Sequence, residues 1–243
     1  DFKHIEVDGP VKIKAFDKAI PSDWEAVAFP LIAALITDSE LVINNVDLSG
    51  TQGDEAIVEV LKSLGADIEL DKQICSLKVH GGTKASNGTG RLSTELLKNK
   101  ELHVNLSGFP DAVCALAAVS CFVEGTVFIE DIGVCRRKET DRIKVLKSEL
   151  EKLGAKVEEG EDFLVIHGHS PVLADGKPNP EFVLHGAEVE SYLDHRVAMS
   201  LACLGLGLKD GQEVKVKDAE CCSVSFPEFF EAMNKIGAGF TQA

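Results

Sequence analysis

The sequence lacks several features by which the class of a protein is often recognised. Its 243 residues include one Trp, one Tyr and two Met, and the first Met is Met199. No apolar run is long enough to span a membrane, and the N-terminus has no signal-peptide pattern. We therefore expect a cytoplasmic protein with no membrane partner. The missing initiator Met indicates a chain that was processed or that is a piece of a longer one.

Cationic residues are also few. Lys and Arg number 25 against 40 Asp and Glu, which gives a formal net charge of −15. Because a nucleic acid needs a broad cationic face, this charge argues against a nucleic acid as partner. A small anion needs only a local positive pocket, so the overall charge does not exclude ligands of that kind.

The common cysteine and nucleotide-binding motifs are missing as well. No two of the seven Cys have CxxC spacing, and the sequence has no GxGxxG, Walker loop, HExxH or GxSxG. Reduced, mostly buried thiols in a cytosolic protein are the favoured interpretation of the cysteines. Metal binding or redox use is the alternative.

What the sequence does contain is a threefold internal repeat. Each copy opens with an Asp before an apolar helix, continues through a β-like stretch, and ends in an amphipathic helix closed by Gly. The opening Asp and closing Gly are 42, 43 and 43 residues apart: Asp23 and Gly65, Asp111 and Gly154, Asp194 and Gly237. Paired strands are expected after the first two copies, at residues 66–81 and 155–168.

The repeat predicts an α/β protein whose units run strand, helix, strand, helix, strand, strand. The first helix of each unit is apolar nearly all round and is expected inside, whereas the second is amphipathic and is expected half exposed. We expect one globular domain of three pseudo-symmetric βαβαββ units, with central helices and the sheets outside. The units cover residues 21–84, 101–170 and 185–243, and the last lacks its final strands.

A cluster of cations departs from the overall acidity. Six of the 25 Lys and Arg lie in the twelve positions 136–147, beside a helix expected to begin near Glu139 or Thr140. A helix N-terminus offers free N–H groups and partial positive charge, so added cations make an anion site. An exposed capping pattern with ion pairs three residues apart is an alternative of equal weight.

The repeat also predicts that the first turns of equivalent helices point to one common end. That end would gather carboxylates and cations into an acid–base and anion-binding surface. Asp111 and Glu139 each have a structural alternative, as a helix cap and a first-turn carboxylate, and a lone His such as His195 is more often structural. The gathered residues would be Asp23, Asp111, Lys138, Glu139, Arg142, Asp194, His195 and Arg196.

Five motifs resemble, in order and spacing, those of the 5-enolpyruvylshikimate-3-phosphate synthases, the 3-phosphoshikimate 1-carboxyvinyltransferases. The resemblance runs from about Lys12 to Phe240. It implies an inside-out α/β barrel of the enolpyruvyl transferase type, of which this chain is the C-terminal domain, with residues 1–20 as an entry strand or linker from a missing N-terminal domain. The motifs are "QGD" at 52–54, "PDA" at 110–112, "KETDR" at 138–142, "DHRVAM" at 194–199 and "SFPEFF" at 225–230.

The resemblance also implies an activity and roles for residues. The family transfers the enolpyruvyl group of phosphoenolpyruvate to the 5-hydroxyl of shikimate 3-phosphate, releasing phosphate, in aromatic amino-acid biosynthesis. Asp111 would take the hydroxyl proton, and Glu139 would handle protons at the enolpyruvyl carbon. No metal or organic cofactor is implied. The implied substrate-binding residues are Lys138, on the shikimate phosphate, Arg142 and Arg196, on phosphoenolpyruvate, and Asp194 and His195.

Two positions depart from the family pattern. Val224 stands where a Lys is usual, and Val134 stands where an Asn is frequent. The other domain and a catalytic Lys are also absent from this sequence, so we expect this chain alone to be inactive. A divergent enzyme weakened at Val224, and a non-catalytic binding module that kept the fold, are the alternatives.

Overall fold

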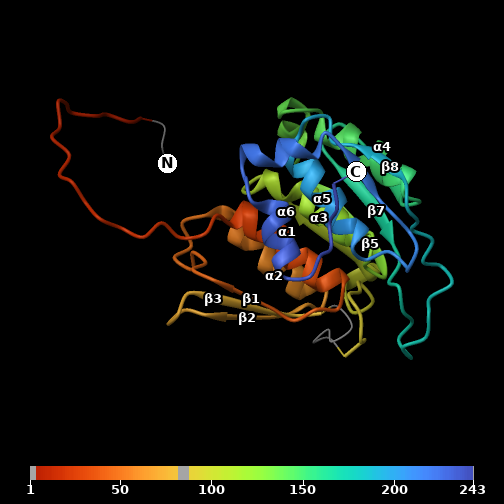
Figure 1. Cartoon of the computed structure of the whole chain (residues 1–243). Helices are drawn as coiled ribbons and strands as arrows, with labels where there is room; N and C mark the ends of the chain where they lie inside the picture. The colour runs from red at the N-terminus through yellow and green to blue at the C-terminus, as the bar shows by residue number, and fades with distance from the viewer. Residues whose placement is uncertain (1–3, 82–87, 243) are drawn as a thin grey trace.

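The computed structural model describes residues 4–81 and 88–242. Residues 82–84 of the first expected unit, residues 1–3 of the expected linker and residue 243 lie outside the described residues. Residues 4–20 carry no helix or strand, are exposed, and extend away from the body of the protein (Figure 1).

Three helices form the centre of the protein, and all three were expected inside. They are α1 (Trp24–Ile36), α3 (Val113–Ser120) and α5 (His195–Gly205). These helices contact one another, and most of their side chains are buried, including Trp24 and Leu201 at 0% exposure. Apolar residues all round a helix fit such a position, because every face meets another part of the core.

Three shorter or more amphipathic helices follow the strands: α2 (Ile57–Ser63), α4 (Arg142–Lys152) and α6 (Phe229–Lys235). In α4 the apolar side chains Ile143, Leu146 and Leu150 are buried while Lys144 is exposed. These helices therefore cover the outside of the core, as their sequence pattern predicts.

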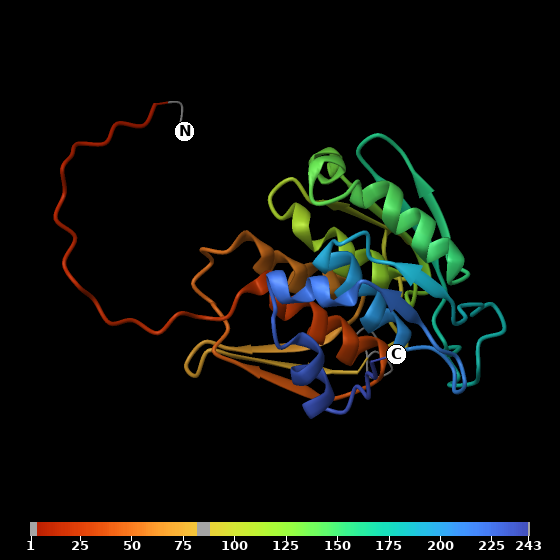
Figure 2. The ribbon, with the colours of Figure 1, turned by 45° about the horizontal axis from the view of Figure 1, so that its top comes forward.

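In residues 4–81 and 88–242, three sheets flank the central helices α1, α3 and α5 (Figure 2). The first has the order β1-β3-β2 and is antiparallel, the second has the order β4-β5-β7-β6, and the third is the parallel pair β8-β9. The expected strand pairs at 66–81 and 155–168 are present as β2–β3 and β6–β7. The strands are β1 (Leu41–Asn44), β2 (Asp67–Asp71), β3 (Ser76–His80), β4 (Glu101–Asn105), β5 (Gly125–Glu130), β6 (Lys156–Glu159), β7 (Leu164–Gly168), β8 (Glu188–Glu190) and β9 (Lys215–Lys217).

One expected helix start is wrong. The sequence pattern placed the start near Glu139 or Thr140, but α4 begins at Arg142, with Asp141 as its N-cap. The Asp141 carboxylate accepts a hydrogen bond of 3.1 Å from the backbone N–H of Lys144. A short Asp side chain reaches that N–H readily, which favours a helix start after Asp141. Glu139 therefore lies before the helix rather than in its first turn.

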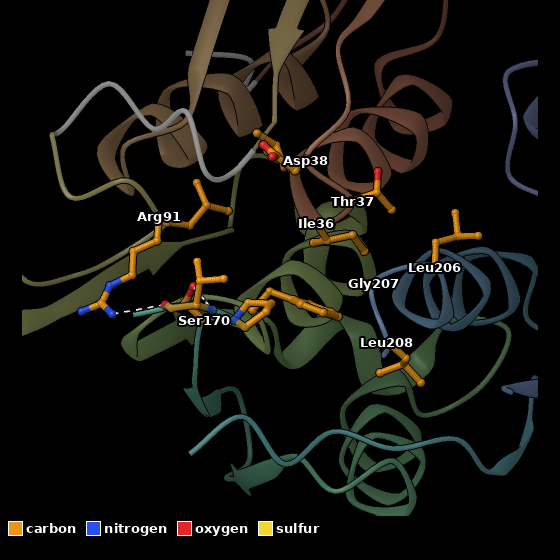
Figure 3. Close-up of a pocket in the computed structure, with 13 residues that line it drawn as sticks. Ile36, Thr37, Asp38, Arg91, Ser170, Leu206, Gly207 and Leu208 are labelled. Carbon is orange, nitrogen blue, oxygen red and sulfur yellow. Dashed lines mark hydrogen bonds between the residues drawn. The ribbon is translucent and has the colours of Figure 1, made fainter. Parts of the chain in front are cut away.

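A pocket of about 280 Å³ lies at the C-terminal ends of α1 and α5 (Figure 3). Leu35 and Ile36 line it from the end of α1, Leu206 and Leu208 line it after α5, and Phe122 lines it after α3. In the described ranges, no helix is long and apolar enough to cross a membrane.

Candidate active site

The N-terminal ends of the central helices carry acidic side chains with different tasks. Asp23 caps α1 by accepting from the N–H of Glu25 at 2.9 Å, and Asp194 caps α5 by accepting from the N–H of Arg196 at 3.0 Å. Asp111 does not cap α3. It lies in the 3-10 turn Pro110–Ala112 before that helix, and its carboxylate is directed to side-chain cations.

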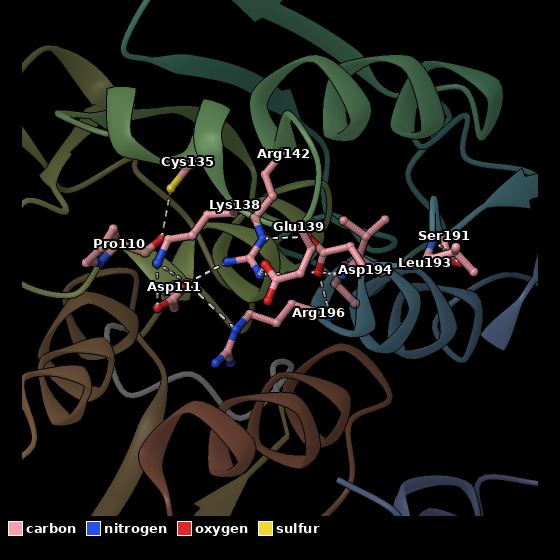
Figure 4. A network of polar contacts seen from close by, with 12 residues as sticks. Pro110, Asp111, Cys135, Lys138, Glu139, Arg142, Ser191, Leu193, Asp194 and Arg196 are labelled. Atoms are coloured by element: carbon pink, nitrogen blue, oxygen red, sulfur yellow. Dashed lines mark hydrogen bonds and ion pairs between the residues drawn. The ribbon is translucent and has the colours of Figure 1, made fainter. Parts of the chain in front are cut away.

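Arg142 is the centre of the charged cluster, and its side chain is only 1% exposed. Its guanidinium contacts three carboxylates: Asp111 at 2.5 Å, Glu139 at 2.7 Å and Asp194 at 2.7 Å (Figure 4). Burial acts to lower the pKa of this guanidinium, but the surrounding carboxylates outweigh it and leave the pKa above its usual value. The arginine is thus a buried, fully paired charge.

The Asp111 carboxylate is surrounded by cations. Besides Arg142, the Lys138 ammonium lies 3.2 Å from it, and the guanidinium Nε of Arg196 lies at 3.7 Å. The Cys135 thiol donates to the carbonyl oxygen of Pro110 at 3.4 Å and so supports the turn that carries Asp111. Burial raises the pKa of Cys135 to about 11, which keeps the thiol protonated as a donor at neutral pH.

Arg196 extends from the start of α5 toward α1, away from its neighbour Asp194 (Figure 4). Its guanidinium forms an ion pair with Glu25 in the first turn of α1. Burial lowers the pKa of Arg196 from its usual value. This contact joins the first and third copies of the repeat, whereas Arg142 joins the second and third.

One predicted site residue, and one further residue of the cationic cluster, have other surroundings. His195 is buried at 5% exposure, and its imidazole has no polar partner among the described residues. Arg136, the first residue of the cationic cluster, pairs with Asp141 at 2.8 Å and with Glu159 at 3.4 Å. Of the six clustered cations, only Lys138 and Arg142 contact Asp111 in the described residues. A substrate-binding role for His195 stays a prediction.

From the sequence, Gln52 is named only as part of the "QGD" motif, and its role at α1 is not predicted. The Gln52 carbonyl oxygen accepts from the N–H of Trp24 at 2.9 Å, and its amide donates to Ser22 and Asp47, both at 3.1 Å. Gln52 therefore fixes the N-terminal end of α1, from 28 residues further along the chain.

Asp54, two residues later, is a partly buried carboxyl beside the cluster. One of its oxygens is buried and has no hydrogen-bond partner in the described part of the chain. Burial, and the negative charge of Asp111, raise the pKa of Asp54 from its usual value.

Val224 ends the 3-10 segment Ala219–Val224, which packs on α5, and is 76% exposed. It offers no charge to a ligand. Across residues 4–81 and 88–242, no three or more His, Cys, Asp and Glu are grouped so that they could hold a metal ion.

Buried helices, flanking sheets and a cluster of paired charges at the helix N-termini define an α/β protein with a polar site at one end of its core. The family model described as EPSP synthase (3-phosphoshikimate 1-carboxyvinyltransferase) matches residues 2–233. The chain belongs to the EPSP synthase family.

Relatives at the level of sequence carry the same description. A 3-phosphoshikimate 1-carboxyvinyltransferase of Ruminiclostridium cellulolyticum is 34% identical over 235 residues, covering 97% of this chain and 48% of the relative. One of Thermodesulfovibrio yellowstonii is 35% identical over 229 residues, covering 93% and 48%. The chain thus spans about half the length of these curated relatives.

A solved structure is similar over the same share of its length. The EPSP synthase of Acinetobacter baumannii matches with a TM-score of 0.71 and 25% identity, covering 90% of this chain and 46% of that one. The likeness extends to the arrangement of the helices and sheets, and it covers about half of that structure.

Proposed function

We propose that this chain is the C-terminal half of a 3-phosphoshikimate 1-carboxyvinyltransferase. Joined to its other half, it transfers the enolpyruvyl group of phosphoenolpyruvate to the 5-hydroxyl of shikimate 3-phosphate in the cytoplasm. Family membership supports this reaction, and the half-length match to the relatives supports a second domain. Both substrates carry a carboxylate and a phosphate, which suits a site rich in Arg and Lys.

The observation that carries the proposal is the position of Asp111. Its carboxylate lies within 4 Å of Lys138, Arg142 and Arg196, the three cations expected to bind the substrates. A hydroxyl held beside these cations can pass its proton to Asp111 while its oxygen attacks the enolpyruvyl carbon. The phosphate group of phosphoenolpyruvate then leaves, and its charge remains compensated by the same cations.

Glu139 is proposed to donate a proton to the methylene carbon of phosphoenolpyruvate and later to remove one from it. Its side chain is 44% exposed and contacts Arg142 at 2.7 Å, so it is oriented and still open to a ligand. Protonation of that carbon accompanies attack by the hydroxyl, and loss of a proton from it accompanies departure of phosphate. A single carboxyl at this position can serve both steps.

For the architecture, we propose an inside-out α/β barrel of three units, at residues 21–84, 101–170 and 185–243. The sheet orders support it. Ser22 forms a parallel bridge to Val46 next to β1, so this bridge has in the first sheet the position that β4 has in the second sheet. The pair β8–β9 corresponds to β4–β5, because both are parallel and both flank a central helix.

The proposal is tested by substrate binding and by turnover. By calorimetry, Lys138→Gln is expected to weaken the binding of shikimate 3-phosphate to this chain by about tenfold, the loss of one charge-assisted contact. Lys144→Gln, an exposed lysine on α4, is the matched control and is expected to bind as the wild type does. Equal affinity of both variants would contradict the proposed site.

An assay of turnover compares this chain alone with the full-length protein. The chain alone, with both substrates, is expected to release no inorganic phosphate above the buffer background, because half of the site is missing. The full-length protein is expected to release it. Phosphate release by the chain alone would refute the division of the site between two halves.

A further inference from the structure

Arg196 is paired within the protein by a residue that the proposed reaction does not use. The Glu25 carboxylate contacts its guanidinium from α1, 171 residues away in sequence. The Arg196 side chain is 10% exposed and that of Glu25 is 27% exposed. The pair therefore lies at the edge of the cluster, where a ligand can reach it.

The cluster holds more carboxylates than cations. Four carboxylates face three cations, so the site is negative overall even though it is proposed to bind anions. An arriving anion therefore has to replace an internal one, or bind against excess negative charge. The carboxylates are those of Glu25, Asp111, Glu139 and Asp194, and the cations are Lys138, Arg142 and Arg196.

Glu25 is the carboxylate whose departure would free Arg196, since the more exposed Glu139 pairs with Arg142 instead. Asp194 is fully buried between Arg142 and the start of α5, and Asp111 is held by two closer cations. The Glu25 carboxylate contacts Arg196 alone among the described residues. Rotation of its side chain into solvent would leave no buried carboxylate unpaired.

We propose that Glu25 is an internal competitor for the anion site on Arg196. Its carboxylate occupies the guanidinium until the phosphate or carboxylate of phosphoenolpyruvate displaces it, and this exchange weakens the affinity for that substrate. The inference rests on the proposed function, since it assumes that Arg196 binds the substrate. Glu25 is thus a residue that sets substrate affinity without taking part in bond making.

The test measures binding of phosphoenolpyruvate to the chain by calorimetry at low salt. Glu25→Gln is expected to bind about threefold to fivefold more tightly than the wild type, as expected for removal of a partly exposed ion pair. Glu25→Ala is a second variant with the same expectation, and circular dichroism checks that both are folded. Inorganic phosphate and pyruvate, titrated separately, show which group of the ligand gains affinity.

The matched control is Glu159→Gln. Its carboxylate also pairs with an arginine, Arg136, and its side chain is 29% exposed, but it lies outside the cluster. It is expected to bind as the wild type does, and Arg196→Gln is expected to cancel the gain of Glu25→Gln.

Three results would overturn the inference. Measurable binding with equal affinities of the wild type and both Glu25 variants would remove the competitor role and leave the proposed function standing. A gain that persists in the Glu25→Gln, Arg196→Gln double variant would show that Arg196 is not the contested group. Failure of every protein to bind any of the three probes would count against the anion site itself, and so against both proposals.

Discussion

The two ends of the central helices differ in chemistry although the same three helices supply both. At the C-terminal ends, Leu35 and Phe122 border a pocket whose lining is mostly apolar, whereas Asp111 and Asp194 at the N-terminal ends contact Arg142 of α4. α1 has 13 residues, so its two ends are roughly 20 Å apart. The pocket and the charged site therefore lie at opposite ends of the central helices.

This separation follows from the backbone. The first turn of a helix leaves N–H groups that need partners, and Asp23 and Asp194 supply them. A cation beside such a carboxylate is then compensated even when it is buried. The N-terminal end therefore holds Arg142 at 1% exposure beside three carboxylates, whereas the buried Arg91 that lines the pocket is paired with Glu95 alone among the described carboxylates.

The largest effect on stability is expected from removing a charge at the N-terminal end of the central helices. Arg142→Met leaves the fully buried Asp194 carboxylate without its cation, and is expected to lower the free energy of unfolding by about 3–5 kcal/mol. Urea denaturation measures it. Arg136→Met is the control, and because the Arg136 side chain is 27% exposed its loss should cost only about 1 kcal/mol. Equal costs would show that burial of the pair adds nothing.

A substitution at the C-terminal end of α1 is expected to lower the stability of the protein without changing its affinity for substrate. Leu35 is 2% exposed at the end of α1, and Leu35→Ala is expected to cost about 2–3 kcal/mol through lost packing and a larger cavity. Its affinity for shikimate 3-phosphate, measured by calorimetry, is expected to match that of the wild type. A parallel fall in affinity would mean that the two ends are coupled through α1.

The smallest effect concerns pH at the charged end. The pKa of Asp54 is raised by burial and by Asp111, so the folded state binds its proton more tightly than the unfolded state. That contribution to stability is complete below the unfolded pKa of about 4 and is lost as pH rises through the folded pKa.

Asp54→Asn removes this titration. Above the folded pKa the variant is expected to be the more stable protein, by less than about 1 kcal/mol because the carboxyl is partly exposed. Urea denaturation between about pH 4 and pH 7 measures the difference. A difference that does not change over this range would contradict the shift.

The sequence allowed the order of the elements and most of the charged cluster to be predicted. The repeat located the apolar helices and the strand pairs, because a regular pattern of apolar residues reflects burial directly. Of the eight residues predicted at the common helix end, six are joined by ion pairs in the structure, while Asp23 caps α1 and His195 is buried without an ion pair to them among the described residues. The six are Asp111, Lys138, Glu139, Arg142, Asp194 and Arg196. Their roles toward substrates stay predictions.

What could not be predicted depends on distant partners. Glu25 follows a helix cap, a position where a carboxylate is common for local reasons, and nothing nearby in sequence points to Arg196. Gln52 likewise acts on Trp24 across an intervening helix and strand. In the cationic cluster, closeness in sequence suggested a shared site that the structure does not have. Arg136 and Arg142 are six residues apart but pair with different carboxylates.

The ladder between β8 and β9 is short, which affects how often its hydrogen bonds open. It contains three residue pairs, against five between β4 and β5. Amide hydrogens in so small a sheet exchange through frequent local opening, at a lower cost than those of a wider sheet. Hydrogen exchange is therefore expected to be faster in β8 and β9 than in β4 and β5, close to the start of the helix that carries Arg196.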